Sequence, residues 1–417
     1  MNIVLKEYEY LQYTKEDEKN YIPKDTFEAL ERFVLKNQDI AQYLIIAFKK
    51  GYGKVLQAKN FVGVIQTKDK ITIEILPKVN NVSNEELKEI LIRMLKSLKK
   101  SPFKNFNMAH LKSSKMPLLE IFISMFLDEL TKLIQKGLKS DYITKEENLK
   151  FLKGKLNIKE QIKQNYIHKE RFFVEYQEFL LNRIENKLIK TTLKYLYKKS
   201  KLNKNQQRIR EYLFILDEVD LSFNIKNDFS KIKLNRQTKE YESILLWCRV
   251  FLLNRSFTPY KGDDIAFALL FDMNLLFESY VYEYLKKYGK YKNITSQDRG
   301  YYLAYLNGKI PKFKLKPDIV INKDSNNVII ADTKWKILSK EKLNQGVNQA
   351  DMYQMFAYGN KYKNCKKIYL IYPYEKIEEG NFYKYSQDQD GLEVKILFFD
   401  ISKPHKQQHF KLEDTYS

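Results

Sequence analysis

Hydrophobic and polar residues repeat with two different periods along the chain, and the change of period divides it into regions. In residues 1–84, the run "ITIEILPKV" places Ile71, Ile73 and Ile75 at every second position, as in a strand with one apolar face. Pro77 ends this run. With the strand-like "KVLQAKNFVGVIQT" and the helix-like "DTFEALERFVLKN" before it, the pattern predicts a β-rich N-terminal module.

In residues 85–260 the period becomes that of a helix. The segment "SNEELKEILIRMLKSLKK" repeats apolar residues at three- and four-residue steps, and Ser83 with Glu86 predicts a capping box at its start. The exposed helix positions carry many Lys and Arg residues, which form either solvated faces or a surface for nucleic acid or a partner. A helical middle region is therefore expected, with further helices in these segments: "PLLEIFISMFLDELTKLIQKGL", "YQEFLLNRIENKLIKTTLKYLYKK", "QQRIREYLFILDEV" and "YESILLWCRVFLLNRSF".

Residues 261–417 follow a loop, "TPYKGDDIA", that is typical of a domain boundary. The segment "FALLFDMNLLFESYVYEYLKKYGK" predicts a helix that ends near Gly289. Two strand-like runs come next in "KPDIVINKDSNNVIIADTKWK", then a helix in "QGVNQADMYQMFAYGNKY" and strands in "KKIYLIYP" and "LEVKILFFDI". This order predicts an α/β domain around a central mixed sheet, in an α+β multidomain chain.

Charge and composition narrow the class of partner. The 417 residues carry a formal net charge of +22, spread along the chain, which favours a polyanion such as nucleic acid over other partners. Cys248 and Cys365 have no CxxC spacing, so neither a disulfide framework nor a zinc ribbon is expected. Two isolated cysteines suit the reducing cytosol. His405 and His409 have ligand-like spacing but no Cys or acidic partner, so a solvated tail is expected rather than a metal site.

No membrane association is expected. The start, "MNIVLKEYEYLQY", lacks the basic and apolar parts of a signal peptide. The longest apolar segment, "MPLLEIFISMFLDEL", contains three acidic residues and is too short to span a bilayer. It predicts a buried helix, and the protein is expected in the cytoplasm.

Two aspartates interrupt the apolar runs in residues 316–336. If these runs pair antiparallel around the loop 323–327, Asp318 faces Asp332 across the hairpin. Facing residues have Cβ atoms about 4.5 to 5.5 Å apart. Two carboxylates so close repel each other, so a positive group should lie between them.

Lys334 lies two residues beyond Asp332 and therefore on the same face of the strand. A divalent cation held by Asp318 and Asp332 beside this ammonium is the simplest arrangement, and oxygen ligands favour Mg²⁺. Such a site can polarise a phosphoryl oxygen and activate water, which predicts phosphodiester hydrolysis. The alternative is an edge strand whose alternating charges lie on a solvated face.

Three further polar residues are candidates for the same site. Glu278 interrupts an apolar helix that should pack on the sheet, and it could supply a third carboxylate to the metal. Gln354 and Tyr358 lie four residues apart on one helix face and could reach a carboxylate, water or a DNA phosphate. The alternative for Glu278 is an exposed position on an amphipathic helix, and the alternative for Gln354 and Tyr358 is the polar edge of a packed helix.

Four segments resemble a known family. "KPDIVI…VIIADTKWK" followed by "QADMYQMFAY" resembles the PD-(D/E)XK nuclease core, and specifically McrC, the endonuclease subunit of McrBC modification-dependent restriction systems. In this resemblance Gln354 and Tyr358 form the QxxxY-like element of related nucleases. "LLFDMNLLFESYVYEYL" and "KNFVGVIQTKDKITIEILPKV" resemble the start of the family's nuclease domain and its N-terminal module.

The resemblance implies a role for each residue of the hairpin. Asp318 and Asp332 become metal-binding carboxylates, and Lys334 becomes the catalytic lysine. Glu278 becomes an accessory acid and possible further metal ligand. The chain has Asp rather than Glu in the (D/E)xK position, which the pattern permits.

The resemblance also implies partners. McrC proteins act with McrB, an AAA+ GTPase that recognises methylated DNA and translocates it. This chain contains no GxxxxGK[ST] motif, so GTP is expected on an McrB-like oligomer to which residues 1–84 and the helical middle dock. The expected cofactor of this chain is Mg²⁺, and the expected substrate is methylated double-stranded DNA. An arginine should stimulate the partner's GTPase, but the sequence does not select one.

Two alternatives stay open. The chain could be the nuclease subunit of a sequence-specific GTP-dependent restriction or phage-defence system, which a neighbouring methyltransferase gene would indicate. It could also be a non-catalytic DNA-binding adaptor that keeps a nuclease fold. The intact set of Asp318, Asp332 and Lys334 is evidence against the adaptor.

Overall fold

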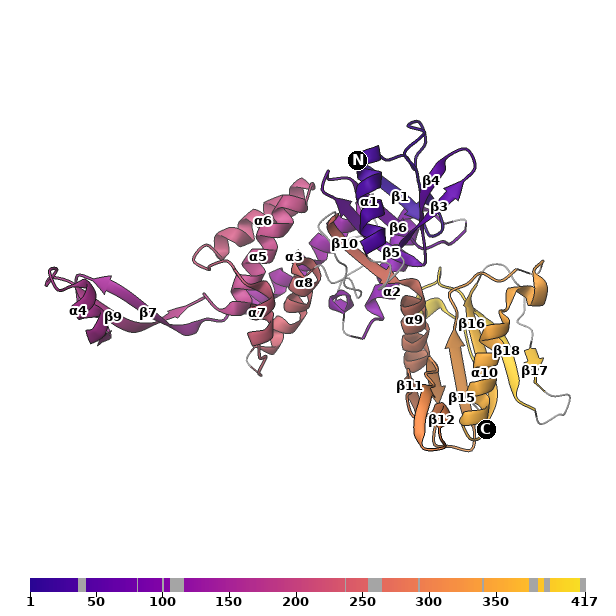
Figure 1. Ribbon diagram of the computed structural model, residues 1–417. Coiled ribbons are helices and arrows are strands. Elements are labelled where there is room, and N and C mark those ends of the chain that lie inside the picture. Colours follow the sequence, from indigo (N-terminus) through magenta and orange to yellow (C-terminus); the bar gives the residue numbers. More distant parts are fainter. Residues whose placement is uncertain are drawn as a thin grey trace. The chain divides into compact units, whose positions relative to one another are not determined.

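The chain folds into two compact units (Figure 1). The first unit holds Met1–Lys104, Lys261–Ala266 and Leu270–Ser417, and the second holds Asn105–Tyr260 with Phe267–Leu269. The predicted three-part division stays a prediction, and its loop at residues 258–264 lies outside the described residues. The computed structural model describes these ranges: 1–36, 43–80, 82–99, 101–105, 116–236, 238–253, 265–291, 293–339, 341–374, 382–385 and 391–412.

The N-terminal residues form two small sheets. The strand orders are β1-β6-β5-β10 and β2-β4-β3. "KVLQAKNFVGVIQT" is therefore two strands, β4 and β5, rather than one. The elements are β1 (Asn2–Lys6), β2 (Tyr10–Leu11), α1 (Lys24–Lys36), β3 (Leu44–Lys49), β4 (Gly53–Ala58), β5 (Phe61–Thr67), β6 (Thr72–Leu76), α2 (Asn84–Lys96), η1 (Pro102–Asn105) and β10 (Ile265–Asp272).

Strand β6 is buried on both faces, although its sequence predicts only one apolar face. It lies between β1 and β5, and α2 contacts it. Glu74 is fully buried and forms an ion pair with Lys88 of α2 at 2.8 Å. The predicted capping box is confirmed, because Ser83 and Glu86 exchange hydrogen bonds at the start of α2.

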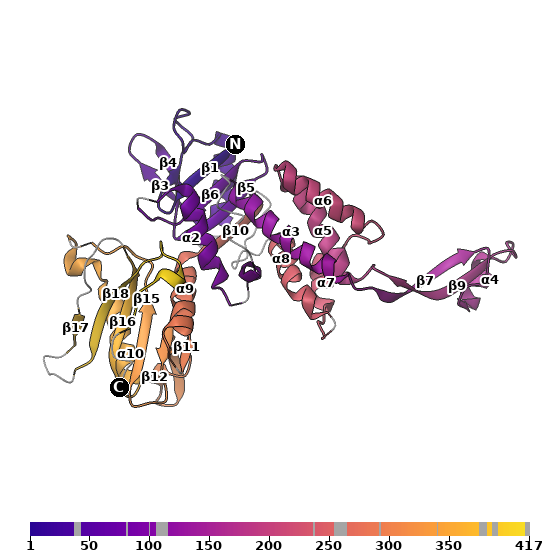
Figure 2. The same ribbon diagram turned by 180° about the vertical axis from the view of Figure 1, so that it is seen from behind.

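The second unit combines helices with a long strand ribbon. Strands β7 and β9 pair along nine residues each and run out from the helices of this unit (Figures 1 and 2). The segment predicted as a helical region therefore also contains the strands β7, β8 and β9. Its elements are α3 (Leu118–Lys136), β7 (Asp141–Leu149), β8 (Lys155–Leu156), α4 (Ile158–Gln164), β9 (Phe172–Leu180), α5 (Ile184–Lys199), α6 (Asn203–Ile215), α7 (Ile225–Lys231), η3 (Lys239–Tyr241) and α8 (Glu242–Leu252).

The predicted buried helix is α3. Its Glu120 is buried, and the carboxylate accepts hydrogen bonds from Ser200 Oγ and Asn205 Nδ2, both at 2.8 Å. This pairing satisfies a charge that the apolar sequence around it could not. Among the helices of the described ranges, none is long and apolar enough to cross a membrane.

The C-terminal residues form a mixed sheet, as predicted. It has six strands in the order β11-β14-β15-β16-β18-β17. Strands β15, β16 and β18 run parallel, and β14 is antiparallel to β15. A separate hairpin, β12-β13, precedes β14. The elements are β11 (Ile294–Ser296), β12 (Tyr302–Leu306), β13 (Ile310–Lys314), β14 (Ile319–Ile321), β15 (Val328–Thr333), η4 (Leu343–Gly346), α10 (Gln349–Lys361), β16 (Cys365–Pro373), β17 (Phe382–Lys384), β18 (Glu393–Phe399) and η5 (His405–Gln407).

Helices α9 (Met273–Tyr288) and α10 pack on opposite faces of this sheet. On the α10 face, Met355 and Tyr358 join a core with Val320 and Ile330. On the other face, the ring of Tyr280 of α9 contacts Phe399, whose side chain points away from the α10 core. The two faces therefore carry separate cores.

The helix predicted from Phe267 onward begins later than expected. Residues up to Asp272 belong to β10, and α9 starts there because the Asp272 side chain accepts a hydrogen bond from the Asn274 amide at 2.9 Å. The predicted end is confirmed, since Gly289 is the C-cap. The expectation of a solvated tail is wrong for His405, whose ring packs on Tyr280 with centroids 4.0 Å apart.

Candidate active site

The β14–β15 hairpin has the predicted register. Val320 pairs with Ile330, and Ile319 pairs with Ala331. One further step places Asp318 opposite Asp332. Because both aspartates share the parity of Val320 and Ile330, they lie on the face that α10 covers.

Asp318 is fixed by the residue that follows Asp332. Its Oδ2 accepts two hydrogen bonds from Thr333, from the backbone amide at 2.8 Å and from the hydroxyl at 2.7 Å. Burial raises the pKa of Asp318, and these two hydrogen bonds oppose that rise. No sequence pattern indicated a role for Thr333, although it is the middle residue of "DTK".

Asp332 is nearly fully buried, with 1% of its surface exposed. Its Oδ2 forms a buried ion pair with Lys334 Nζ at 2.5 Å. Burial raises the pKa of Asp332 to about 7, and the charge of Asp318 adds to the rise. The pair of carboxylates is therefore under-compensated by the protein alone.

Lys334 connects the carboxylates to α10. Its ammonium donates to Gln354 Oε1 at 3.0 Å, and Gln354 Nε2 donates to the Tyr358 hydroxyl at 2.7 Å. Burial lowers the pKa of Lys334, but Asp332 and then Asp318 outweigh this and leave it above its usual value. The ammonium is thus held charged beside both carboxylates, and the structure joins the two predicted α10 residues to it.

Glu278 of α9 also belongs to this neighbourhood. Its Oε2 accepts a hydrogen bond from Gln297 Nε2 at 3.1 Å. Burial raises the pKa of Glu278 to about 8, and the charge of Asp318 is the next largest cause. Gln297 also donates its backbone amide to the Asp318 carbonyl at 2.8 Å, so one residue links both acids. No sequence pattern indicated Gln297.

Two carboxylates, those of Asp318 and Asp332, are suitable ligands for a magnesium ion. Mg²⁺ binds through one or two carboxylates and keeps several waters, and two facing aspartates, for which the protein supplies one neighbouring ammonium, suit such an ion. Across the residues that the structure describes, no three His, Cys, Asp or Glu side chains form a group that could hold a metal ion. The role of Glu278 as a third ligand therefore stays a prediction.

A further buried acid, Glu7, contacts the residue that follows Lys334. Glu7 of the N-terminal segment accepts hydrogen bonds from Trp335 Nε1 at 3.0 and 3.1 Å and from the Lys78 amide at 3.0 Å. Burial raises the pKa of Glu7 to about 7, and these hydrogen bonds oppose the rise. The contact joins residues 328 positions apart, next to Lys334 in the sequence.

The titration of Glu7 predicts a pH dependence of stability. Because its folded pKa is above its unfolded value, the folded state binds more protons between about pH 4.5 and 7. The contribution of Glu7 to the free energy of unfolding is fully present below about pH 4.5. It is lost as the pH rises from there through 7, by up to about 3 kcal/mol in total. In urea unfolding, Glu7→Gln should remove this fall, whereas Glu9→Gln, at an exposed neighbour, should keep it. Parallel pH curves for wild type and Glu7→Gln would contradict the prediction.

Comparison with known proteins places the chain in a family. Residues 56–373 match the family model of the McrBC 5-methylcytosine restriction system component. The type IV methyl-directed restriction enzyme EcoKMcrBC of Escherichia coli K12 is 22% identical over 315 residues, which cover 72% of this chain and 88% of that protein.

Solved structures share the fold. A chain of the half-complex refined from the tetradecameric assembly of Thermococcus gammatolerans McrB AAA+ hexamers with bound McrC superposes with a TM-score of 0.71 at 18% identity, over 98% of this chain and 97% of that one. A chain of the cryo-EM structure of the McrBC complex from the same organism superposes with a TM-score of 0.51 at 20% sequence identity. This superposition covers 69% of this chain and 88% of that one. The chain belongs to the family of McrBC 5-methylcytosine restriction system components, and it is McrC-like.

Proposed function

We propose that this chain is the endonuclease subunit of a McrBC-type restriction complex and cleaves DNA phosphodiester bonds with Mg²⁺ at a PD-(D/E)XK site. The observation that carries the proposal is the register of the β14–β15 hairpin. It brings two carboxylates, half-buried Asp318 and buried Asp332, to facing positions with Lys334 Nζ 2.5 Å from Asp332. A structural ion pair needs only one of these acids.

The residues divide the chemistry among them. Asp318 and Asp332 would hold Mg²⁺, which when bound polarises a phosphoryl oxygen and lowers the pKa of water. Lys334 orients the attacking water and offsets the negative charge that develops on the phosphate. Its position is set by Asp332 on one side and by Gln354 at 3.0 Å on the other.

Gln354 and Tyr358 act as positioning residues. Gln354 accepts a hydrogen bond from the ammonium of Lys334 and donates one to the Tyr358 hydroxyl. The Tyr358 side chain is buried in the core between α10 and the sheet. The amide is therefore held in one orientation, with its oxygen toward the lysine. Glu278 is the accessory acid, and Gln297 holds it beside Asp318.

The chain works, in this proposal, with an McrB-like AAA+ GTPase. Support comes from the structurally similar Thermococcus gammatolerans assembly, which contains McrB AAA+ hexamers with bound McrC. The sequence of this chain has no phosphate-binding GxxxxGK[ST] loop of its own. The net charge of +22 suits a DNA substrate.

The test is reconstitution. This chain is purified with an McrB-like AAA+ protein of the same organism, and cleavage of methylated and unmethylated plasmid DNA is measured with Mg²⁺, with and without GTP. Cleavage that requires the partner, GTP and methylation is expected. Efficient cleavage of unmethylated DNA by this chain alone would contradict the McrBC assignment, and cleavage confined to one unmethylated sequence would indicate a sequence-specific system.

A further inference from the structure

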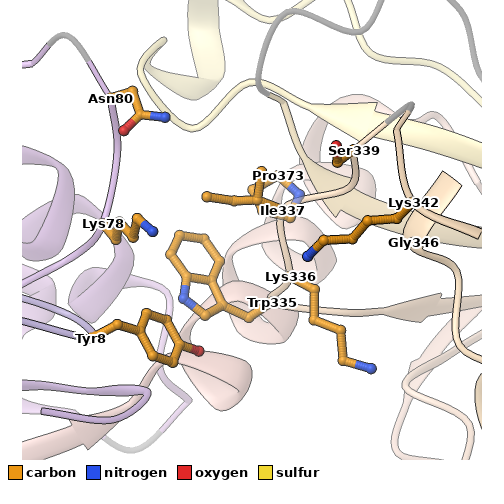
Figure 3. Close-up of a pocket in the computed structure, with 10 residues that line it drawn as sticks. All are labelled: Tyr8, Lys78, Asn80, Trp335, Lys336, Ile337, Ser339, Lys342, Gly346 and Pro373. Carbon is orange, nitrogen blue, oxygen red and sulfur yellow. The ribbon is translucent and has the colours of Figure 1, made fainter. Parts of the chain in front are cut away.

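A pocket of about 520 Å³ lies where the N-terminal segment meets the stretch that follows Lys334 (Figure 3). Both sides belong to the first compact unit. Tyr8 and Lys78 come from the N-terminal side, while Trp335 and Lys342 come from the C-terminal side. The full set of lining residues is Tyr8, Lys78, Asn80, Trp335, Lys336, Ile337, Ser339, Lys342, Gly346 and Pro373.

The lining of this pocket is cationic. It contains three lysines and no acidic residue. Lys336 is paired with Asp351 at 3.0 Å, and in Figure 3 its side chain points away from the pocket. Lys78 and Lys342 instead extend toward Trp335 from opposite sides (Figure 3), and neither forms an ion pair with a carboxylate of a described residue. Two ammonium groups facing one space form a site for an anion.

A buried carboxylate fixes the two sides of the pocket relative to each other. Glu7 accepts hydrogen bonds from Trp335 Nε1 and from the backbone amide of Lys78, so one buried carboxylate ties both walls together. Trp335 is 7% exposed as a residue, whereas Tyr8 is 43% exposed and offers an aromatic surface to a ligand. A site whose walls are already tied needs little reorganisation on binding.

The pocket adjoins the candidate active site along the chain. Trp335 and Lys336 follow Lys334 directly, and two residues span at most about 7 Å. Lys336 is also paired with Asp351, whose charge acts on Asp332 and Lys334. A strand with its scissile phosphate at Lys334 would therefore pass this pocket with a neighbouring part of its backbone.

We propose that this pocket binds the phosphodiester backbone of the DNA strand that flanks the cleaved bond, through the ammonium groups of Lys78 and Lys342. The inference rests on the proposed nuclease function and adds to it a DNA contact from the N-terminal segment. Tyr8 lies where a base of the same strand can stack on its ring. Residues of both ends of the chain then position one strand for cleavage.

The test measures binding without cleavage. Binding of a fluorescein-labelled duplex oligonucleotide to the full chain is followed by anisotropy in EDTA across a salt series. Lys78→Ala/Lys342→Ala should weaken binding about 10- to 100-fold at low salt and reduce the slope of log K against log [salt] by about 2, because each phosphate contact contributes about 1. Lys78→Arg/Lys342→Arg keeps the charge and should restore most of the affinity.

A matched pair of exposed turn lysines, Lys68→Ala/Lys363→Ala, removes the same charge elsewhere in this unit and should change binding by less than about threefold. Equal losses in both pairs would overturn the pocket and leave the nuclease function intact. Absence of DNA binding by the wild-type chain would overturn the pocket but not the nuclease function, which the proposal assigns to the complex with its partner. Free GTP and inorganic phosphate are titrated in parallel, and saturable binding of either that is lost in Lys78→Ala/Lys342→Ala would assign the pocket to a small anion instead of DNA.

Discussion

Lys334→Ala should reduce DNA cleavage by about 10³-fold or more, since a positioned proton-transfer or charge-stabilising group contributes about 10² to 10⁴. The protein should still fold. Asp332 loses its ammonium partner, but burial already raises the pKa of this carboxyl to about 7, so it takes up a proton instead of remaining a buried charge. The measurement is the initial rate of cleavage of methylated plasmid by the complex with GTP and Mg²⁺.

Two controls separate chemistry from assembly. Lys363→Ala removes an exposed lysine just after α10 and should leave the cleavage rate unchanged. GTP hydrolysis by the complex should be the same for Lys334→Ala and wild type, because the lysine lies in the hairpin site and not on a nucleotide. If Lys334→Ala keeps more than a tenth of the wild-type cleavage rate, Lys334 is not the catalytic lysine.

The hairpin could be predicted because its information is local. Alternation fixes which residues share a face, and a short loop between two apolar runs fixes the register. These two facts place Asp318 opposite Asp332, and the structure has the same register, because Ile319 pairs with Ala331 in the step before. Lys334 follows from the same period of two.

The partners of these residues could not be predicted, because tertiary packing brings them together. Gln297, just after β11, bonds to Glu278 across 19 residues, and Glu7 bonds to Trp335 across 328 residues. Neither contact has a sequence period. Thr333 was hidden for another reason: its backbone amide, which any residue has, makes half of its contact with Asp318.

The errors in secondary structure have a common cause. The predicted helices begin with "YQEFL" and "FALLFD", because the helical period of each segment extends backward over the apolar end of the preceding strand. In the structure the first lies in β9, which is paired along its length with β7, and the second lies in β10, at the edge of the N-terminal sheet. Strand pairing over a long separation overrides the local pattern.

Asp332→Asn should abolish Mg²⁺-dependent cleavage while changing the stability of the metal-free protein by less than about 1 kcal/mol, or even raising it. The substitution keeps the shape of the side chain and removes one of two facing carboxylates that repel each other. Lys334 keeps Gln354 and the charge of Asp318 as partners. A purely structural ion pair would behave differently, since removing one member of a buried pair costs about 3 to 5 kcal/mol.

The effect of magnesium on thermal unfolding tests the same residue without any cleavage assay. An ion that binds only the folded protein stabilises it by about 2.7 kcal/mol at 100 times its dissociation constant, so Mg²⁺ should raise the melting temperature of the wild type. Asp332→Asn should lose most of this rise, whereas Asp324→Asn, in the exposed loop of the same hairpin, should keep it. A large loss of metal-free stability in Asp332→Asn, or an undiminished response to Mg²⁺, would show that Asp332 serves the fold and not the metal.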